Sequence, residues 1–280
     1  MLFNTYEPWK FAFSSESSNL EEAIPNSWGI IGVPFDSTSS YHTGSRFGPI
    51  VIREASFGFE KFNTIFNKEL DTIFHDFGDV NTIPGNCTKT SKIIEETVLE
   101  LLQYNIKPLM IGGEHSISYG SVKSILDKTD NLTVVHLDAH RDLADEFISE
   151  ECSHATVLRR IYELGLKELI QIGIRSSSKE EEDFVKNKKD ITTFKSNVAI
   201  DDILKKLDEI DSDIYLTIDM DVFDPSFVPD VSNPTPCGMN PSDIEKILKV
   251  LSCKNIVGMD VVEINSNRLG STSAITASKI

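Results

Sequence analysis

Two hydrophobic segments of the chain each end in polar residues that alternate along the sequence, and this pattern constrains the fold and the chemistry most. The first segment reads VVHLDAHRD and ends at Asp142, and the second reads YLTIDMD and ends at Asp221. Residues two apart on an extended strand point to the same side, so Asp138, His140 and Asp142 can converge if the backbone stays extended. Asp219 and Asp221 repeat this spacing. Carboxylates and an imidazole brought together in this way predict a site for a divalent metal ion.

The hydrophobic pattern along the rest of the chain predicts strands that alternate with helices. The expected strands cover residues 28–34, 72–77, 108–111, 132–138, 170–174, 214–219 and 256–262. The expected helices cover residues 50–55, 89–102, 116–126, 155–164, 179–187, 199–209 and 241–252. Strands that are apolar on both faces indicate a parallel sheet with helices on both sides, an α/β fold of three layers. We expect one domain over residues 1–280, with an irregular segment at residues 1–27.

A third strand end supplies a further ligand candidate, because sites in such sheets form at the carboxyl ends of the strands. The sequence GGEHS follows the expected strand 108–111 and contains His115. The expected metal ligands are His115, Asp138, His140, Asp142, Asp219 and Asp221. Six ligands around one ion leave no place for water, whereas two ions that share carboxylates keep a water between them. Four Asp and two His without Cys favour Mn²⁺ over structural Zn²⁺, with Fe, Co and Mg left open. For His136, deeper in its strand, we expect a supporting or core role.

Composition narrows the partners and the compartment. The formal net charge of -17 argues against nucleic acid and anionic membranes as partners and is compatible with a cationic substrate. The four cysteines form no CxxC pair, which predicts free thiols in a reducing cytoplasm. No apolar run approaches the roughly 20 residues that span a bilayer, and no signal peptide is recognisable, so we expect a cytoplasmic protein. Neither GxGxxG nor GxxxxGK[ST] occurs, which removes the usual signals for nucleotide binding.

Several motifs in a fixed order resemble the signatures of one enzyme superfamily. The motifs are GGEHS, HLDAHRD, CSHAT, TIDMDVFDPSFVP and GMDVVEIN, preceded near the N-terminus by GVPFD and GSRFGP. Together they resemble the ureohydrolases, the superfamily of arginases and agmatinases. The resemblance extends from about residue 29 to about residue 270 and is closest to the agmatinase branch.

The resemblance implies a three-layer α/β fold, two Mn²⁺ ions per subunit and a homo-oligomer, usually a trimer or hexamer. One ion would be held by His115, Asp138, Asp142 and Asp219. The other would be held by Asp138, His140, Asp219 and Asp221. In this family a metal-bridging hydroxide attacks the guanidinium carbon, and Asp142 would accept its hydrogen bond. His154 matches the histidine that passes a proton to the leaving amine, and Glu263 matches the acid that binds the guanidinium.

The loop between Asp142 and His154 bears on the identity of the substrate. Arginases hold the α-carboxylate of their substrate with an Asn two residues after the third metal Asp, and this chain has Ala144 there. The loop also carries the acids Asp145, Glu146, Glu150 and Glu151. Acids repel a carboxylate and suit an amine, so agmatine is expected rather than arginine or guanidinobutyrate.

We therefore expect a manganese-dependent agmatinase that releases putrescine and urea, a reaction of polyamine biosynthesis. The chain departs from the agmatinase pattern at Ala155, where Gly is usual, and within residues 230–238, where Thr235 replaces the usual Glu. Two alternatives stay open. One is a hydrolase of another amidino compound, of the arginase, guanidinobutyrase or formiminoglutamase type, and the other is a metal-binding protein without catalysis. A two-metal phosphoesterase is disfavoured because no basic phosphate-binding cluster accompanies the acids.

Overall fold

The computed structural model describes residues 4–6, 9–64 and 66–280. The main sheet of this part of the chain has nine strands in the order β1-β5-β2-β6-β11-β10-β7-β8-β9. The strands that follow β1 (Thr5–Tyr6) are β2 (Trp28–Val33), β5 (Phe74–Val80), β6 (Lys107–Gly112), β7 (Leu132–Leu137), β8 (Glu168–Ile174), β9 (Ile191–Lys195), β10 (Asp213–Asp219) and β11 (Ile256–Val262). Neighbours pair in parallel except β1, which runs antiparallel to β5. A separate hairpin joins β3 (Phe62–Asn63) and β4 (Lys68–Glu69).

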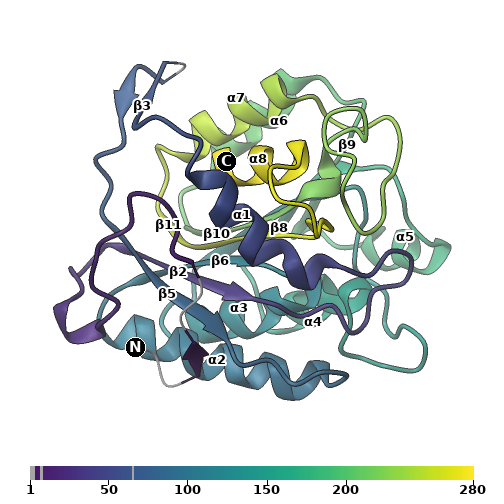
Figure 1. Ribbon diagram of the computed structural model, residues 1–280. Helices are drawn as coiled ribbons and strands as arrows, with labels where there is room; N and C mark the ends of the chain where they lie inside the picture. Colours follow the sequence, from purple (N-terminus) through teal and green to yellow (C-terminus); the bar gives the residue numbers. More distant parts are fainter. Residues whose placement is uncertain (1–3, 7–8, 65) are drawn as a thin grey trace.

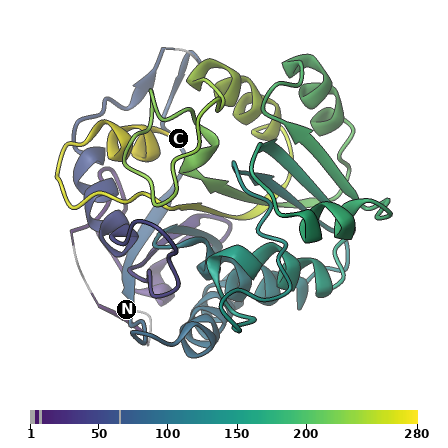
Figure 2. The same cartoon turned by 90° about the vertical axis from the view of Figure 1, so that its right-hand side faces the viewer.

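Helices cover both faces of this sheet, which confirms the predicted three-layer α/β class (Figures 1 and 2). One face carries α1 (Gly48–Ser56), α6 (Ile200–Asp208), α7 (Pro241–Leu251) and α8 (Thr272–Lys279). The other face carries α2 (Cys87–Gln103), α3 (Ser118–Leu126) and α4 (Val157–Glu163). The short helix α5 (Lys179–Val185) packs beside α4, where Phe184 meets Tyr162 edge-on.

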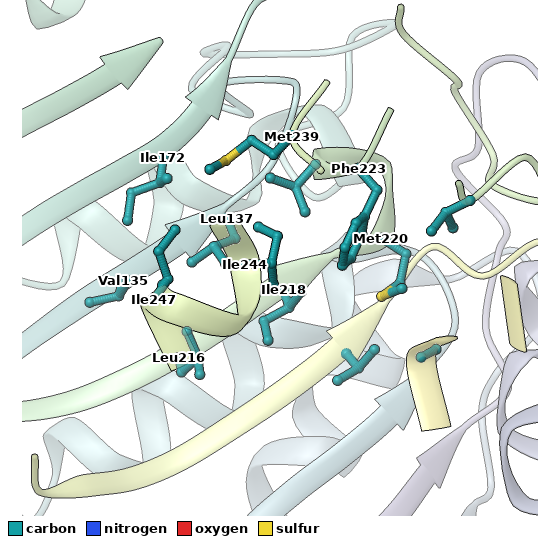
Figure 3. Close-up of a cluster of buried hydrophobic side chains, with 14 of the residues drawn as sticks. Val135, Leu137, Ile172, Leu216, Ile218, Met220, Phe223, Met239, Ile244 and Ile247 are labelled. Carbon is teal, nitrogen blue, oxygen red and sulfur yellow. The ribbon is translucent and has the colours of Figure 1, made fainter. Parts of the chain in front are cut away.

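The central strand β7 is buried along its whole length and β10 is buried from Ile214 onward, because each of their two faces packs against a helical layer. Val135, Leu137, Leu216 and Ile218 all point toward α7, as Figure 3 shows. On the other face, Leu132 and Val134 of β7 and Tyr215 of β10 pack in one cluster with residues of α3 and α4. Each fully buried side chain of this kind stabilises the fold by about 1.5–3 kcal/mol. The packing fixes the carboxyl ends of β7 and β10 as neighbours.

The structure differs from the expectations at the two ends of the chain and at β9. The segment 1–27 is not wholly irregular, since β1 joins the sheet and a short 3-10 helix covers Leu20–Glu22; residues 1–3 and 7–8 lie outside the described residues. Strand β9 and helix α8 were not predicted. The strand ITTFK is only half-buried at the sheet edge, and α8 is short and weakly apolar, so neither gives a strong periodic signal. Every helix in the described part of the chain is too short or too polar to cross a lipid bilayer.

The prediction of free thiols is wrong for two of the four cysteines. Cys87 at the start of α2 forms a disulfide with Cys152, with the Cα atoms 5.8 Å apart. Cys237 and Cys253 are exposed free thiols. The bonded cysteines are 65 residues apart, and only the tertiary fold brings them together. The disulfide joins α2 to the loop that precedes His154. Because two of the cysteines are bonded, the cysteines no longer support the prediction of a reducing compartment.

Candidate metal centre and active-site pocket

The structure brings the six predicted metal ligands together at the carboxyl ends of β6, β7 and β10. The Nδ1 atom of His115 lies 3.1 Å from Asp138 Oδ2, 3.1 Å from Asp142 Oδ2 and 3.4 Å from Asp219 Oδ2. The Nδ1 atom of His140 lies 2.9 Å from Asp221 Oδ2 and 3.5 Å from Asp138 Oδ1. Asp138 thus takes part in two adjoining groups of candidate ligands. This is a buried His/Asp metal-binding cluster.

The donor atoms fit divalent cations. His115 is fully buried, and its Nδ1 atom has no hydrogen-bond partner although carboxylate oxygens surround it. Burying a polar atom without a partner costs about 1–3 kcal/mol, and a cation at this position removes that cost. Carboxylate oxygens and imidazole nitrogens are the donors that Mn²⁺ and related ions accept.

The ligands converge by turns and not by strand alternation, which corrects the reasoning from the sequence. Strand β7 ends at Leu137, so the following acids and histidine lie beyond the extended backbone. Asp142 has a φ of 55°, in the left-handed region where a residue other than glycine is strained by about 1–3 kcal/mol. Asp219 ends β10, and Asp221 lies in the short 3-10 helix that follows. The spacing was informative, but the backbone that satisfies it is a pair of tight turns.

Backbone amides hold the carboxylates in these turns. Asp138 Oδ1 accepts the N–H of His140 at 2.6 Å, and Asp219 Oδ1 accepts the N–H of Asp221 at 2.8 Å. Asp221 Oδ1 accepts the N–H of Ala139 at 3.0 Å, which joins the two strand ends. The carboxylate positions are therefore fixed by the chain itself.

Burial and crowding of like charges disfavour the ionised forms of Asp142 and Asp219, whereas neighbouring histidines lower the pKa of Asp138 well below its ordinary value. Burial, with the nearby charge of Asp138, raises the pKa of Asp142 to about 6. Burial also raises the pKa of Asp219 well above its ordinary value, with contributions from Asp221 and Asp138. Cations bound among these groups stabilise the charged forms and reverse such shifts.

His136 lies within reach of the cluster, but its hydrogen bonds favour a supporting role over metal ligation. Gln171 Oε1 accepts a hydrogen bond from Arg141 Nη1 at 2.9 Å, which leaves Gln171 Nε2 as the donor to His136 Nδ1 at 3.1 Å. The other ring nitrogen, Nε2, then carries the proton and donates to Asp138 Oδ2 at 2.7 Å. An imidazole used at both nitrogens in this way orients Asp138.

The donors and acceptors around His115 show in the same way how its ring is oriented. Thr217 Oγ1 donates its single hydrogen to Asp260 Oδ1 at 2.5 Å, so it can only accept from His115 Nε2 at 2.9 Å. Nε2 therefore carries a proton, and in the neutral ring the lone pair of His115 is on Nδ1, which faces the carboxylates. Sequence reasoning missed Thr217, Asp260 and Gln171. Their signal is a polar residue inside a buried apolar strand, and their registered pairing across β7, β8, β10 and β11 appears only in the sheet.

A pocket adjoins the cluster, and its lining includes Asp142, His154 and Glu263. Glu263 directly follows β11 and has a φ of 66°, a second strained backbone at the site. Its Oε1 atom accepts the N–H of His115 at 2.7 Å, while its Oε2 atom is buried without a hydrogen-bond partner. Burial raises the pKa of Glu263 to about 8. Among the described residues, neither Lys nor Arg forms an ion pair with this carboxyl.

His154 begins a short 3-10 helix at the pocket wall. Its Nδ1 atom lies 3.2 Å from Thr38 Oγ1, and its Nε2 atom lies 3.2 Å from Ser40 Oγ. The ring of Phe147 packs edge-on against the imidazole, with the centroids 5.1 Å apart. Burial lowers the pKa of His154 to about 4, so the imidazole is neutral near pH 7.

The four acids of the 143–153 loop do not line the pocket, contrary to the sequence-based expectation; the loop contributes Ala144 and Phe147 instead. Asp145 turns outward and lies 2.7 Å from Arg160 Nη2. Thr235, at the departure from the agmatinase pattern, places its Oγ1 atom 3.4 Å from His140 Nε2. The argument from an acidic loop is therefore wrong.

Comparison with known proteins identifies the family. A family model described as Arginase family matches residues 26–280. The chain is 35% identical to the N(1)-aminopropylagmatine ureohydrolase of Thermococcus kodakarensis, over 99% of this chain and 94% of that protein. It is 34% identical to an agmatinase of Pyrococcus horikoshii, over 90% and 88% respectively. A solved structure of a putative agmatinase from Clostridium difficile superposes with a TM-score of 0.85 at 33% identity, covering 93% of this chain and 95% of that one.

The fold and the His/Asp cluster define a metal-binding hydrolase of linear amidines. The chain belongs to the arginase family, the ureohydrolases, whose substrates are guanidino compounds.

Proposed function

We propose that this protein is an agmatinase that hydrolyses agmatine to putrescine and urea with two Mn²⁺ ions. The observation that carries the proposal is the buried Oε2 atom of Glu263, which forms no hydrogen bond with the described residues and belongs to a residue that lines the pocket. A guanidinium is planar, cationic and rich in N–H donors, so it satisfies such an oxygen and restores the charge of the carboxylate. The name of the Pyrococcus relative, an agmatinase, supports agmatine as the substrate, and the name of the Thermococcus relative, an N(1)-aminopropylagmatine ureohydrolase, supports the same class of reaction on a larger guanidino compound.

The six clustered residues are the proposed ligands of the two ions. The shared position of Asp138 between two ligand groups supports two ions over one. The bound ions would supply an activated water as nucleophile near neutral pH and polarise the guanidino group. In the proposal, Asp142 orients that water by accepting its hydrogen bond. Glu263 holds the guanidinium, and His154 gives a proton to the departing amine nitrogen.

The rest of the pocket favours a substrate without a carboxylate. Ala144 offers no hydrogen-bond donor from its side chain, and Arg141 is the lining residue with a guanidinium. The Arg141 guanidinium already donates to Glu182 Oε1 at 2.7 Å, Gln171 Oε1 at 2.9 Å and Thr193 Oγ1 at 3.0 Å. Within the described lining, a substrate carboxylate would thus find neither an unpaired guanidinium nor, at Ala144, the Asn that arginases use, which disfavours arginine and guanidinobutyrate. This argument replaces the one based on the acidic loop.

Urea release from Mn²⁺-loaded protein tests the proposal, with agmatine, N(1)-aminopropylagmatine, arginine and guanidinobutyrate assayed in parallel. We expect fast turnover of agmatine and little of the two carboxylates. Preference for arginine would overturn the substrate assignment, and no urea from any of them would overturn the function. Asp138→Asn should lower kcat/KM more than about 100-fold, since even the partners of metal ligands contribute 10–100-fold.

A further inference from the structure

The side chain of Thr38 lies between the buried carboxylate of Glu114 and the imidazole of His154. Thr38 belongs to the loop after β2, Glu114 follows β6, and His154 lies 116 residues after Thr38. The Oγ1 atom of Thr38 lies 2.6 Å from Glu114 Oε1 and 3.2 Å from His154 Nδ1. Thr38 Oγ1 also accepts the backbone N–H of His154 at 3.0 Å.

Glu114 is fully buried and is surrounded by donors. Its Oε2 atom accepts the backbone N–H of Thr38 at 2.7 Å, and its Oε1 atom accepts the hydroxyl of Ser116 at 2.6 Å as well as that of Thr38. A carboxylate can only accept hydrogen bonds. The single hydroxyl hydrogen of Thr38 is therefore committed to Glu114.

The hydrogen bond from Thr38 Oγ1 to Glu114 determines which nitrogen of His154 carries the proton. A hydroxyl that has donated its hydrogen has only lone pairs to offer, so Nδ1 of His154 must be the donor in the contact with Thr38. The lone pair of the neutral ring is then on Nε2, the nitrogen next to Ser40. Ser40 and His154 both line the pocket.

We propose that Thr38, held by Glu114, is a positioning residue that fixes the Nδ1–H tautomer of His154 and leaves Nε2 free to exchange a proton in the pocket. The inference rests on the proposed role of His154. Nε2 takes up one proton that the attacking water releases and gives it to the amine nitrogen, which leaves with the electron pair of the carbon–nitrogen bond as that bond breaks. Nδ1 keeps its own proton throughout, donated to Thr38. The opposite tautomer would present an N–H where a lone pair is needed.

The alternative is a protonated Glu114. Burial raises the pKa of Glu114, and the hydrogen bonds from Ser116 and Thr38 oppose that rise. A protonated Glu114 could donate to Thr38 and release its hydroxyl hydrogen toward Nδ1, which would place the imidazole proton on Nε2. The two arrangements give opposite tautomers and are separable by experiment.

The tautomer can be observed by nitrogen NMR on the full chain labelled with ¹⁵N-histidine, in Mg²⁺, which is diamagnetic. The His154→Asn variant identifies the signals. We expect protonated Nδ1 and unprotonated Nε2 in the wild type and in Thr38→Ser, and loss of that pattern in Thr38→Val. A wild-type ring protonated at Nε2 would overturn the proposal. This measurement needs no turnover, so it stands even if the proposed function fails.

Kinetics provide the second measurement. Thr38→Val should lower kcat for agmatine about 100-fold with little change in KM and should alter the pH profile, because a wrong histidine tautomer impairs proton transfer. Thr38→Ser keeps the hydroxyl and should restore activity. Thr43→Val, an exposed position of the same loop, controls for the substitution itself. Unchanged kcat in a folded Thr38→Val protein with normal metal content would refute the positioning role, and if that variant fails to fold, the wild-type and Thr38→Ser spectra still decide.

Discussion

The strand-end cluster and the loop wall of the pocket are built in different ways. The ligands of the cluster follow central strands, and their orientation comes from backbone amides and a registered row of buried polar side chains. The loop wall at residues 143–153 is buried at both ends and mostly exposed between them. Ile148 and Ser149 have left-handed conformations, and a disulfide at Cys152 joins the loop to α2. The comparison indicates that the chemistry depends on the sheet, whereas substrate choice depends on loops that can change without disturbing it.

Removal of the metal should have the largest effect on stability and activity, because it leaves the carboxylates of the strand-end cluster without cations. Each ion at 100 times its Kd stabilises the fold by about 2.7 kcal/mol, so two ions contribute about 5 kcal/mol. Chelation should therefore lower the Tm substantially and abolish activity. Thermal melting with and without EDTA measures this effect.

The loss should grow as the pH rises. The pKa of Asp142 in the metal-free fold is about 6 and that of Glu263 is about 8, both raised above their ordinary values. A raised carboxyl pKa contributes stability that is complete below about pH 4 and is lost as the pH rises through the raised value. The Tm of the metal-free protein should fall between about pH 5 and pH 8, while the loaded protein changes little. Equal melting of both forms at pH 8 would contradict a cation site among these carboxylates.

Loss of the disulfide should have an intermediate effect on stability and should act on the 143–153 loop, not on the strand-end cluster. The bond closes a loop with a sequence separation of 65 residues, for which chain entropy gives about 4 kcal/mol and measured values typically reach about 2–4 kcal/mol. The double variant Cys87→Ser, Cys152→Ser should melt earlier and show a higher KM for agmatine with unchanged metal content. The variant Cys237→Ser, Cys253→Ser removes the exposed free thiols and is the matched control. Loss of bound metal in the first variant would show that the two regions are not independent.

Neutralising an acid of the loop should have the smallest effect. Asp145 is exposed and pairs with Arg160 and Arg159, at 2.7 Å and 3.5 Å, outside the pocket. Exposed ion pairs contribute about 0–1 kcal/mol, so Asp145→Asn should leave kcat/KM for agmatine within about twofold. Glu263→Gln serves as the comparator that should weaken substrate binding. A strong rise in KM in Asp145→Asn would show that the acids of this loop contribute to substrate binding after all.

The sequence alone determined the class of fold and which histidines and aspartates cluster at the strand ends, whereas their roles as metal ligands stay a prediction. Apolar segments of strand length alternating with amphipathic helices leave few arrangements other than a covered parallel sheet, and the acids and histidines at the strand ends must then meet at one edge. The predicted helices 89–102 and 241–252 correspond closely to α2 and α7 for this reason. The agmatinase assignment and the two Mn²⁺ ions stay predictions.

Only the tertiary structure decided the contacts between distant segments. The Cys87–Cys152 disulfide, the outward turn of Asp145 and the contact of Thr38 with Glu114 and His154 all join residues from separate elements. No local pattern encodes these pairs, because the hydrophobic period reports which face of an element is buried and not which polar group meets it there. The turns at Asp142 and Glu263 are decided in the same way, since a left-handed backbone at a residue other than glycine persists only where surrounding contacts hold it.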